Sequence, residues 1–400
     1  MCKSHDTILT MKHHIHIKKS NALYTISVMS FFLALHIALP TYFNSSFLST
    51  ITSENNLSLI YSIQAVLTII GLLFMSSILR KFGNYRTSII LIILQTFFFY
   101  GILNFTSPYI IISFFILALT MVNLIGFTFD VFLGENTDIE NTGAIRGHYM
   151  TVTNSAWILG PLIGGILILG ENYRGIYIAA FALLFPLVYI VYRNFSNFVD
   201  PHYPNISLTK TLKSIFKNSD ISRLMIINTV LQIFYAWMTI YTPIYLYKFV
   251  GFNWSEIGII LTIMLIPFVL IETPLGRLAD KRFGEKEIMA IGFIIMGIMT
   301  IALSFIIGKN IILWTIFLFI TRIGAAAAEI MIETYFFKKV DKKDSEILGI
   351  FRVTRPISYL IAPLITSVSL LFIGDEYLFI VLGVLCLLTL IPILSIRDTA

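Results

Sequence analysis

The chain has 400 residues, of which 57% are hydrophobic and 12% are charged, and its mean hydropathy is +0.86. So much apolar surface excludes a soluble protein with a single core and is typical of a protein embedded in a bilayer. The formal net charge of +6 is explained by basic loops between apolar segments, so it implies no nucleic-acid partner.

Twelve apolar segments of roughly 20 residues, the length that crosses a bilayer as helix, follow one another along the chain. Their hydrophobicity is continuous, whereas barrel strands alternate over about 10 residues. We therefore predict an all-α integral membrane protein with twelve transmembrane helices. The predicted spans are 21–43, 58–78, 87–105, 109–133, 147–170, 175–194, 224–247, 255–278, 287–308, 311–336, 347–372 and 376–396.

One long polar stretch, which contains Pro201 and Pro204, separates the sixth span from the seventh. Because the other connections are short, we expect consecutive helices to be antiparallel neighbours. The predicted organisation is a tail at 1–20, a six-helix bundle at 21–194, a linker at 195–222, a second six-helix bundle at 223–396 and a tail at 397–400.

Three sequence matches recur at lags of 201 to 203 residues, between Pro40 and Pro243, Gly83 and Gly284, and Pro161 and Pro363. Unrelated segments would scatter the offsets, so the two halves share one architecture. A membrane protein built from two like halves is predicted to carry a substrate path between them.

The distribution of Lys and Arg among the loops predicts the orientation of the chain in the membrane. With the N-terminus inside, 24 of the 28 basic residues lie in or beside inner segments, so the positive-inside rule predicts that both termini are cytoplasmic. Cys2 and Cys386 form no disulfide framework, and the histidines of the N-terminal tail lack further ligands for a metal. We expect a multi-pass monomer of a prokaryotic cell (inner) membrane, with no cofactor and no metal.

A glycine and acidic motif lies between spans eight and nine, with Gly276, Asp280 and Gly284 at fixed spacing and basic residues between and after them. The basic members are Lys281, Arg282 and Lys286. This pattern, with six helices on each side of a linker, resembles the signature of the major facilitator superfamily of secondary transporters. A basic loop obeying topology alone would explain the lysines but not the two glycines and the aspartate.

The resemblance implies a cytoplasmic latch between the two halves. It implies that Asp280 meets the start of the fifth helix near Arg146, and Glu272, one turn before Gly276, is expected to support this latch. The first-half copy has Leu79 where the second half has Asp280, so the two half-interfaces should differ in strength.

A second motif in the fifth span contains Gly160, Pro161, Gly164 and Gly165 and resembles the Gly-Pro-x-x-Gly-Gly motif of antiporters in this superfamily. The proline would bend the helix and the glycines would allow close packing. As a plain packing device it would fit any transporter, so it favours efflux without deciding it.

The tenth span carries Arg322, Glu329 and Glu333, although a charge at this depth costs on the order of 2.5 to 3.5 kcal/mol. Steps of seven and eleven residues place Glu329 and Glu333 each within about 20° of the direction of Arg322, so all three lie on one helix face. We predict that this stripe lines an aqueous cavity for substrate and protons. A static ion pair to another helix is the alternative.

Further polar groups in the predicted spans complete the proposed cavity. They are His36, Asn123, Asp130, Gln232, Tyr235 and Trp237. For His36 two roles stay open, a proton carrier and a hydrogen-bonded packing residue.

Together these features predict a transporter that works by alternating access, with proton-coupled efflux of a small amphipathic molecule as the leading hypothesis. Nutrient uptake is the alternative within the class. A membrane-embedded transferase and a non-transporting sensor are the alternatives outside it. The chain contains no P-loop, dinucleotide fold or catalytic triad, so we predict no enzyme activity. The expected partners are the small-molecule substrate, with the proton as coupling ion, and membrane lipid.

Overall fold

The computed structural model describes residues 2–41, 43–52, 54–137, 141–167, 173–203, 213, 215, 217–281, 284–340, 345–374 and 377–397. Within these ranges, side chains are described from Ala22 onward, except for those of some helical residues, among them Pro161, Gly165, Asp280 and Lys281. Over the described part of the chain every regular element is a helix.

The helices that precede the linker are called the first half, and those that follow it the second half. The first half contains α1 (Cys2–Thr41), α2 (Asn44–Ser49), α3 (Glu54–Phe82), α4 (Asn84–Asn104), α5 (Pro108–Asn136), α6 (Thr142–Leu167), α7 (Arg174–Ala182) and α8 (Leu184–Phe195). The second half contains α10 (Ser219–Tyr245), the π-helix η2 (Leu246–Val250), α11 (Trp254–Lys281), α12 (Glu285–Leu303), α13 (Ile311–Lys339), α14 (Ser345–Ser369), α15 (Leu378–Leu388) and α16 (Leu390–Ser395).

Among the described residues, eleven helical stretches are long and apolar enough to cross a membrane. They coincide with eleven of the twelve predicted spans to within six residues at each end. The remaining prediction, 147–170, corresponds to α6, which is not among the eleven and whose predicted end lies outside the described residues. The all-α membrane class is therefore confirmed.

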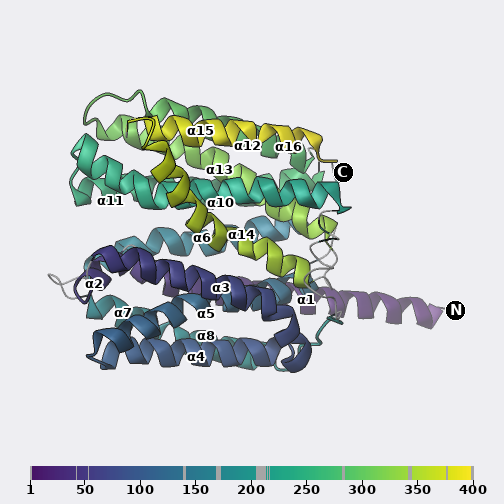
Figure 1. Cartoon of the computed structure of the whole chain (residues 1–400). Helices are drawn as coiled ribbons and strands as arrows, with labels where there is room; N and C mark the ends of the chain where they lie inside the picture. The colour runs from purple at the N-terminus through teal and green to yellow at the C-terminus, as the bar shows by residue number, and fades with distance from the viewer. Residues whose placement is uncertain are drawn as a thin grey trace.

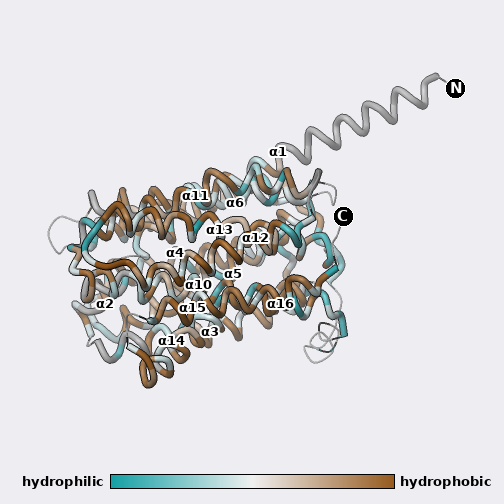
Figure 2. Tube along the Cα trace, turned by 90° about the horizontal axis from the view of Figure 1, so that it is seen from above, coloured by the Kyte–Doolittle hydropathy of each residue, from teal (hydrophilic) through white to brown (hydrophobic). Residues whose placement is uncertain are grey.

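The long helices run side by side, with the first half below and the second half above in Figure 1 and with α6 and α14 between them. Both chain ends lie at one end of the bundle, which we call the termini end. Apolar residues dominate the length of the bundle and hydrophilic residues gather toward its ends (Figure 2). This distribution is the one that a bilayer requires.

Two spans are broken by proline. The α7–α8 break lies at Leu183, three residues before Pro186, and the α15–α16 break lies at Thr389, three residues before Pro392. Proline lacks an N–H group and clashes with the carbonyl four residues earlier, so it interrupts the helix at this distance. In the first half, this break lies on the face of the bundle next to α4.

The segment after α8 folds back onto the start of α4. The Asp200 carboxylate accepts hydrogen bonds from the Asn84 backbone N–H at 2.6 Å and from the Tyr203 hydroxyl at 2.9 Å. The preceding residue, Gly83, has φ 77°, a left-handed conformation that favours glycine. A carboxylate at a helix N-terminus is favourable because it meets unpaired N–H groups and the positive end of the helix dipole.

Candidate functional site

Near the termini end, the two halves touch through the backbones of α6 and α11. A Cβ atom added at Gly276 would collide with the Gly143 carbonyl oxygen, and one added at Gly147 would lie 2.5 Å from the Glu272 carbonyl oxygen. The Thr273 hydroxyl bonds with the Gly147 carbonyl at 3.2 Å. The motif glycine Gly276 therefore allows the close approach of two helices, but its partner helix belongs to the other half.

A buried carboxylate spans the same interface. Glu272 of α11 is fully buried and accepts two hydrogen bonds from the Asn154 side-chain amide of α6, at 2.9 and 3.0 Å. The Asn154 amide nitrogen donates to both oxygens of the Glu272 carboxylate. The contact therefore requires that both oxygens act as acceptors, as they do in the ionised form. Asn154 was not predicted as a site residue, although a polar amide inside an apolar span is a visible signal.

Glu329 lies on α13 and accepts a hydrogen bond from the Tyr235 hydroxyl of α10 at 2.7 Å. The ring of Tyr235 packs edge-on against Phe268, with centroids 6.0 Å apart. The guanidinium of Arg322 lies over the same aromatic wall, 5.1 Å from the Phe234 ring centre and 5.9 Å from that of Tyr235. The predicted residues Arg322, Glu329 and Tyr235 therefore do come together.

Glu272 interacts electrostatically with both Glu329 and Glu333. We call Glu272, Glu329, Asn154, Tyr235 and Arg322 the carboxylate cluster. Negative charges in a buried setting repel one another, and a proton on one of them removes part of that repulsion. The arrangement is thus chemically able to take up and release a proton at the boundary between the halves.

A second group of charges closes the termini end, and we call its members, Asp130, Arg146, Glu333 and Arg352, the ion network. Arg146 donates to Asp130 at 3.0 Å and lies 3.8 Å from Glu333. Arg352 donates to Asp130 at 2.7 Å and makes a short bond to Glu333 through Nη1. Two first-half and two second-half residues alternate in charge, so the network joins α5 and α6 to α13 and α14.

This network corrects the cavity role that was predicted for two carboxylates. Asp130 and Glu333 were expected to line an aqueous cavity, but both carboxylates bind arginines instead, which for Glu333 is the static ion pair weighed as the alternative. Arg146 pairs with Asp130, and its guanidinium lies over the Phe337 ring. The predicted contact between Asp280 and the region of Arg146 stays a prediction, because the Asp280 side chain lies outside the described residues. A charge buried at this interface needs a partner of opposite sign, because an uncompensated buried charge is strongly destabilising.

Part of the predicted latch cannot be placed. The side chains of Asp280 and Lys281, and Arg282 as a whole, lie outside the described residues. Gly284 immediately precedes α12 and has φ −65°. Other residues also adopt this backbone conformation, so it does not require glycine. Lys286 follows it in the first turn of α12 and is half-buried.

His36 lies in the core of the first half. Its Nδ1 lies 2.8 Å from the Ala180 carbonyl oxygen, its Nε2 lies 2.8 Å from the Gln95 amide nitrogen, and its ring packs on Phe99. Since a carbonyl only accepts, Nδ1 carries the hydrogen and Nε2 accepts from Gln95. Of the two roles left open for His36, these contacts favour the hydrogen-bonded packing residue.

Three other predicted cavity residues lie on α5 and α10. Asn123 is half-buried and its amide donates to Leu119 on its own helix at 2.9 Å. Gln232 is half-buried on α10, and Trp237 is fully buried beside Tyr241. The contacts of Asn123 and Trp237 are with residues of their own helices, so the cavity role of all three stays a prediction.

The glycines of the fifth span pack α6 against α1 of its own half. A Cβ added at Gly160 would lie 2.5 Å from the Ala38 Cβ, and one added at Gly164 would lie 2.6 Å from the Phe43 ring. The Pro161 side chain and the surroundings of Gly165 lie outside what the structure describes. Close helix packing, one of the roles predicted for this motif, is what the two described glycines provide.

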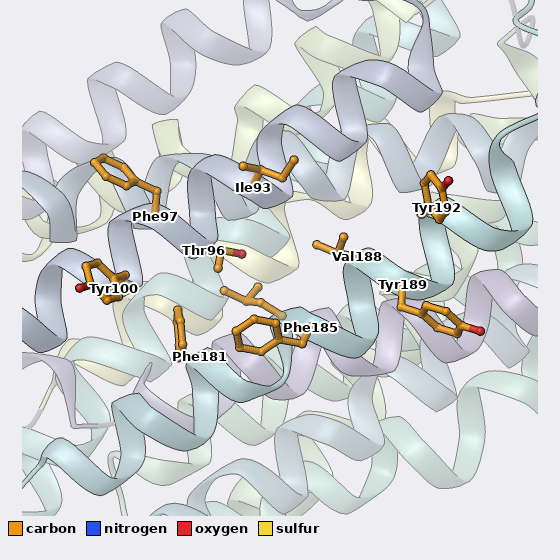
Figure 3. A pocket seen from close by; sticks show the side chains of 10 residues that line it. Ile93, Thr96, Phe97, Tyr100, Phe181, Phe185, Val188, Tyr189 and Tyr192 are labelled. Atoms are coloured by element: carbon orange, nitrogen blue, oxygen red, sulfur yellow. The ribbon is translucent and has the colours of Figure 1, made fainter.

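A cavity lies away from this site, between α4 and α7–α8 (Figure 3). Its volume is about 650 Å³, and its lining is almost wholly apolar and aromatic. Of the described residues, no group of three His, Cys, Asp or Glu side chains is placed to hold a metal ion.

The comparisons with known proteins agree with this architecture. A family model described as the Major Facilitator Superfamily matches residues 20–259 and 224–400. The fold is similar to that of the human organic anion transporter MFSD10 (TETRAN), with a TM-score of 0.77, at 10% identity, covering 94% of this chain and 99% of that one. No curated protein matches the chain in sequence.

The family match covers each half of the chain, and the structural match covers almost its whole length. Together with the apolar helices, they show an integral, multi-pass membrane protein that is not an enzyme. The chain belongs to the Major Facilitator Superfamily and is a membrane transporter.

Proposed function

We propose that this transporter is a proton-coupled efflux antiporter, which moves a small amphipathic molecule by alternating access between its two halves. The observation that carries the proposal is the bond from Asn154 of the first half to both oxygens of Glu272 in the second half. Glu272 is titratable and takes part in the contact between the two halves. Proton binding to its carboxylate therefore directly affects whether the halves separate.

The termini end corresponds to the cytoplasmic side in this proposal, because Lys and Arg concentrate in the segments at that end. In the described conformation this side is closed by the ion network and by the contact of Gly276 with Gly143. Substrate captured from the cytoplasm requires the opposite conformation, in which these contacts separate.

The proton acts through the geometry of the Glu272 carboxylate. An ionised carboxylate accepts at both oxygens, whereas a protonated one keeps one carbonyl acceptor and gains a hydroxyl donor. Asn154 then loses one of its two bonds, and the link between α6 and α11 weakens. Proton binding therefore favours opening of the cytoplasmic side.

Glu329 and Tyr235 supply the place where substrate and proton meet. The Tyr235 ring, with Phe268 and Phe234 beside it, offers an aromatic surface next to the Glu329 carboxylate. A bound molecule that alters the Tyr235 contact changes the partner of Glu329, and Glu329 interacts with Glu272. Inward movement of one proton supplies about 2.3 kcal/mol per 100 mV for outward transport.

The direction of transport is supported by the resemblance of Gly160 and Gly164 to the antiporter motif of the superfamily. Their close contacts with Ala38 and Phe43 give α6 and α1 a tight internal packing, so that α6 moves with its half. Rigid halves are what alternating access requires.

The test is proton movement in proteoliposomes that contain the full chain and a pH-sensitive dye. Compounds that raise the thermal stability of the purified protein serve as substrates. The proposal expects compound-dependent proton flux in the native chain and in Glu256→Gln, a control at a carboxylate that pairs with Lys309 outside the cluster. It expects loss of this flux in Glu329→Gln.

Unchanged flux in Glu329→Gln would show that this residue does not couple protons to transport. Movement of compound and protons in the same direction would refute antiport and support uptake instead.

A further inference from the structure

The cavity between α4 and α7–α8 is an aromatic groove on the outside of the first half. Both of its walls belong to membrane-spanning segments, Asn84–Asn104 and Arg174–Phe195. Figure 3 shows side chains from the two walls facing one another across it. We call this the aromatic groove, and its lining is Ile93, Thr96, Phe97, Tyr100, Phe181, Leu184, Phe185, Val188, Tyr189 and Tyr192.

The second half is closed at the corresponding place. There α12 and α15 touch through glycines, since a Cβ added at Gly297 would lie 3.0 Å from the Gly383 carbonyl oxygen. The repeat lag of about 202 residues puts Gln95 and Phe181 at the equivalent first-half positions. Neither of these residues is a glycine, so α4 and α7–α8 cannot make the close glycine contact that joins α12 and α15.

The groove runs toward two arginines at the termini end. Seven residues separate Arg86 from Ile93, and four separate Arg193 from Tyr189, so each arginine continues the helix face that lines the groove. Both side chains are exposed, and neither forms an ion pair with a described residue. The groove thus combines an apolar length within the membrane with positive charge at its end.

We propose that one anionic phospholipid binds in the aromatic groove, with an acyl chain between α4 and α7–α8 and its phosphate beside Arg86 and Arg193. An acyl chain that moves from the bilayer into the groove exchanges one apolar environment for another and gains little free energy. Apolar packing alone therefore gives no preference for one lipid over another. The arginines supply the preference, because a basic side chain at the membrane surface attracts an anionic headgroup. The ligand is selected by its headgroup and held by its chain.

Native mass spectrometry of the full chain in detergent tests this site. Phosphatidylglycerol and phosphatidylcholine with identical acyl chains are offered at equal concentration. The native chain should retain one phosphatidylglycerol in preference to phosphatidylcholine. The double variant Arg86→Gln with Arg193→Gln should bind phosphatidylglycerol about tenfold more weakly.

Two further variants locate the effect. Val188→Trp fills the groove and should reduce retention of both lipids, although both arginines remain. Lys217→Gln removes an exposed charge outside the groove and should leave lipid binding as in the native chain. Elution profile and thermal stability in the same detergent confirm that each variant is folded.

Equal retention of the two lipids by the native chain would overturn the proposal. Unchanged preference for phosphatidylglycerol in the folded double variant would overturn it as well, as would full retention in folded Val188→Trp. Because this site lies apart from the carboxylate cluster, none of these outcomes depends on proton coupling.

Discussion

Asp130 and Arg352 are 222 residues apart in the chain, and they form a two-bonded ion pair across the boundary between the halves. The guanidinium Nε and Nη2 lie 2.7 and 3.0 Å from the two carboxylate oxygens, in the paired geometry that suits arginine. Arg146 and Glu333 extend this pair into a network of alternating charge. Closure of the termini end therefore rests on contacts that must be broken together.

The substitution Asp130→Asn should favour separation of the two halves at the termini end. Loss of one member of a buried pair costs about 3 to 5 kcal/mol, and since Arg352 is partly exposed we expect the lower end of that range. A cysteine introduced by Thr151→Cys, at the interface with Thr273, should then react faster with a maleimide. Asp220→Asn, at the same end but outside the network, is the control. An unchanged reaction rate would show that the network does not hold this end closed.

Adding one methyl group at Gly276 should separate the two halves. In Gly276→Ala the new Cβ meets the Gly143 carbonyl, which cannot move aside because it belongs to a helix backbone. Gly258→Ala is the matched control on the same helix, since no atom lies within 4 Å of its added Cβ. Cross-linking between cysteines at Thr151 and Thr273 should fall in the first variant and persist in the second. Equal cross-linking in both would contradict this packing.

Removing the carboxylate in Asp200→Ala should destabilise the first half by about 1 kcal/mol, because the start of α4 loses its acceptor. Burial beside Asp200 raises the pKa of the Tyr203 hydroxyl, so this group remains a donor into the alkaline range. Tyr203→Phe should therefore cost the same small amount of stability at neutral and at alkaline pH. Thermal unfolding of the purified variants measures both effects, and a cost that disappears at alkaline pH would refute the assigned donor.

His36→Leu should reduce stability without changing proton coupling. It removes bonds to Ala180 and Gln95 and leaves buried polar groups unpaired, at a cost of about 1 to 3 kcal/mol. The folded variant in proteoliposomes should show the same ratio of protons to substrate as the native chain. A changed ratio of protons to substrate would indicate that His36 carries protons during transport.

The sequence predicted the spans well because the bilayer imposes one simple requirement on each of them. A helix has to be about 20 residues long and apolar, and both properties can be read without knowledge of its neighbours. The exception, α6, carries Arg146 and Asn154 together with the glycines of its motif. Its interfaces with both halves favour polar and small residues over an evenly apolar surface.

The candidate site was predicted only in part. Periodicity correctly placed Arg322, Glu329 and Glu333 on one helix face, but it does not say which helix lies opposite each residue. Glu329 meets Tyr235, whereas Glu333, about one turn further along, meets Arg352. The partners come from other helices, so neither a cavity nor an ion pair could be assigned from one helix alone.

The repeat also predicted more symmetry than the loops possess. Gly83 and Gly284 occupy equivalent positions, yet Gly83 has φ 77° and Gly284 has φ −65°. The difference accompanies Asp200, which approaches the backbone at Gly83 and binds the start of α4. A carboxylate from the linker thus serves the first-half loop, in which Leu79 replaces the motif aspartate.

The distance between the halves as a function of pH tests most directly whether protonation of Glu272 releases the termini end. Spin labels at Asn194→Cys and Glu287→Cys, two exposed sites of opposite halves, are placed in a chain carrying Cys2→Ser and Cys386→Ala. As the pH falls, the native chain should shift toward the longer distance, and Glu272→Gln should already show it at high pH. Distances that respond to pH equally in both chains would contradict the account.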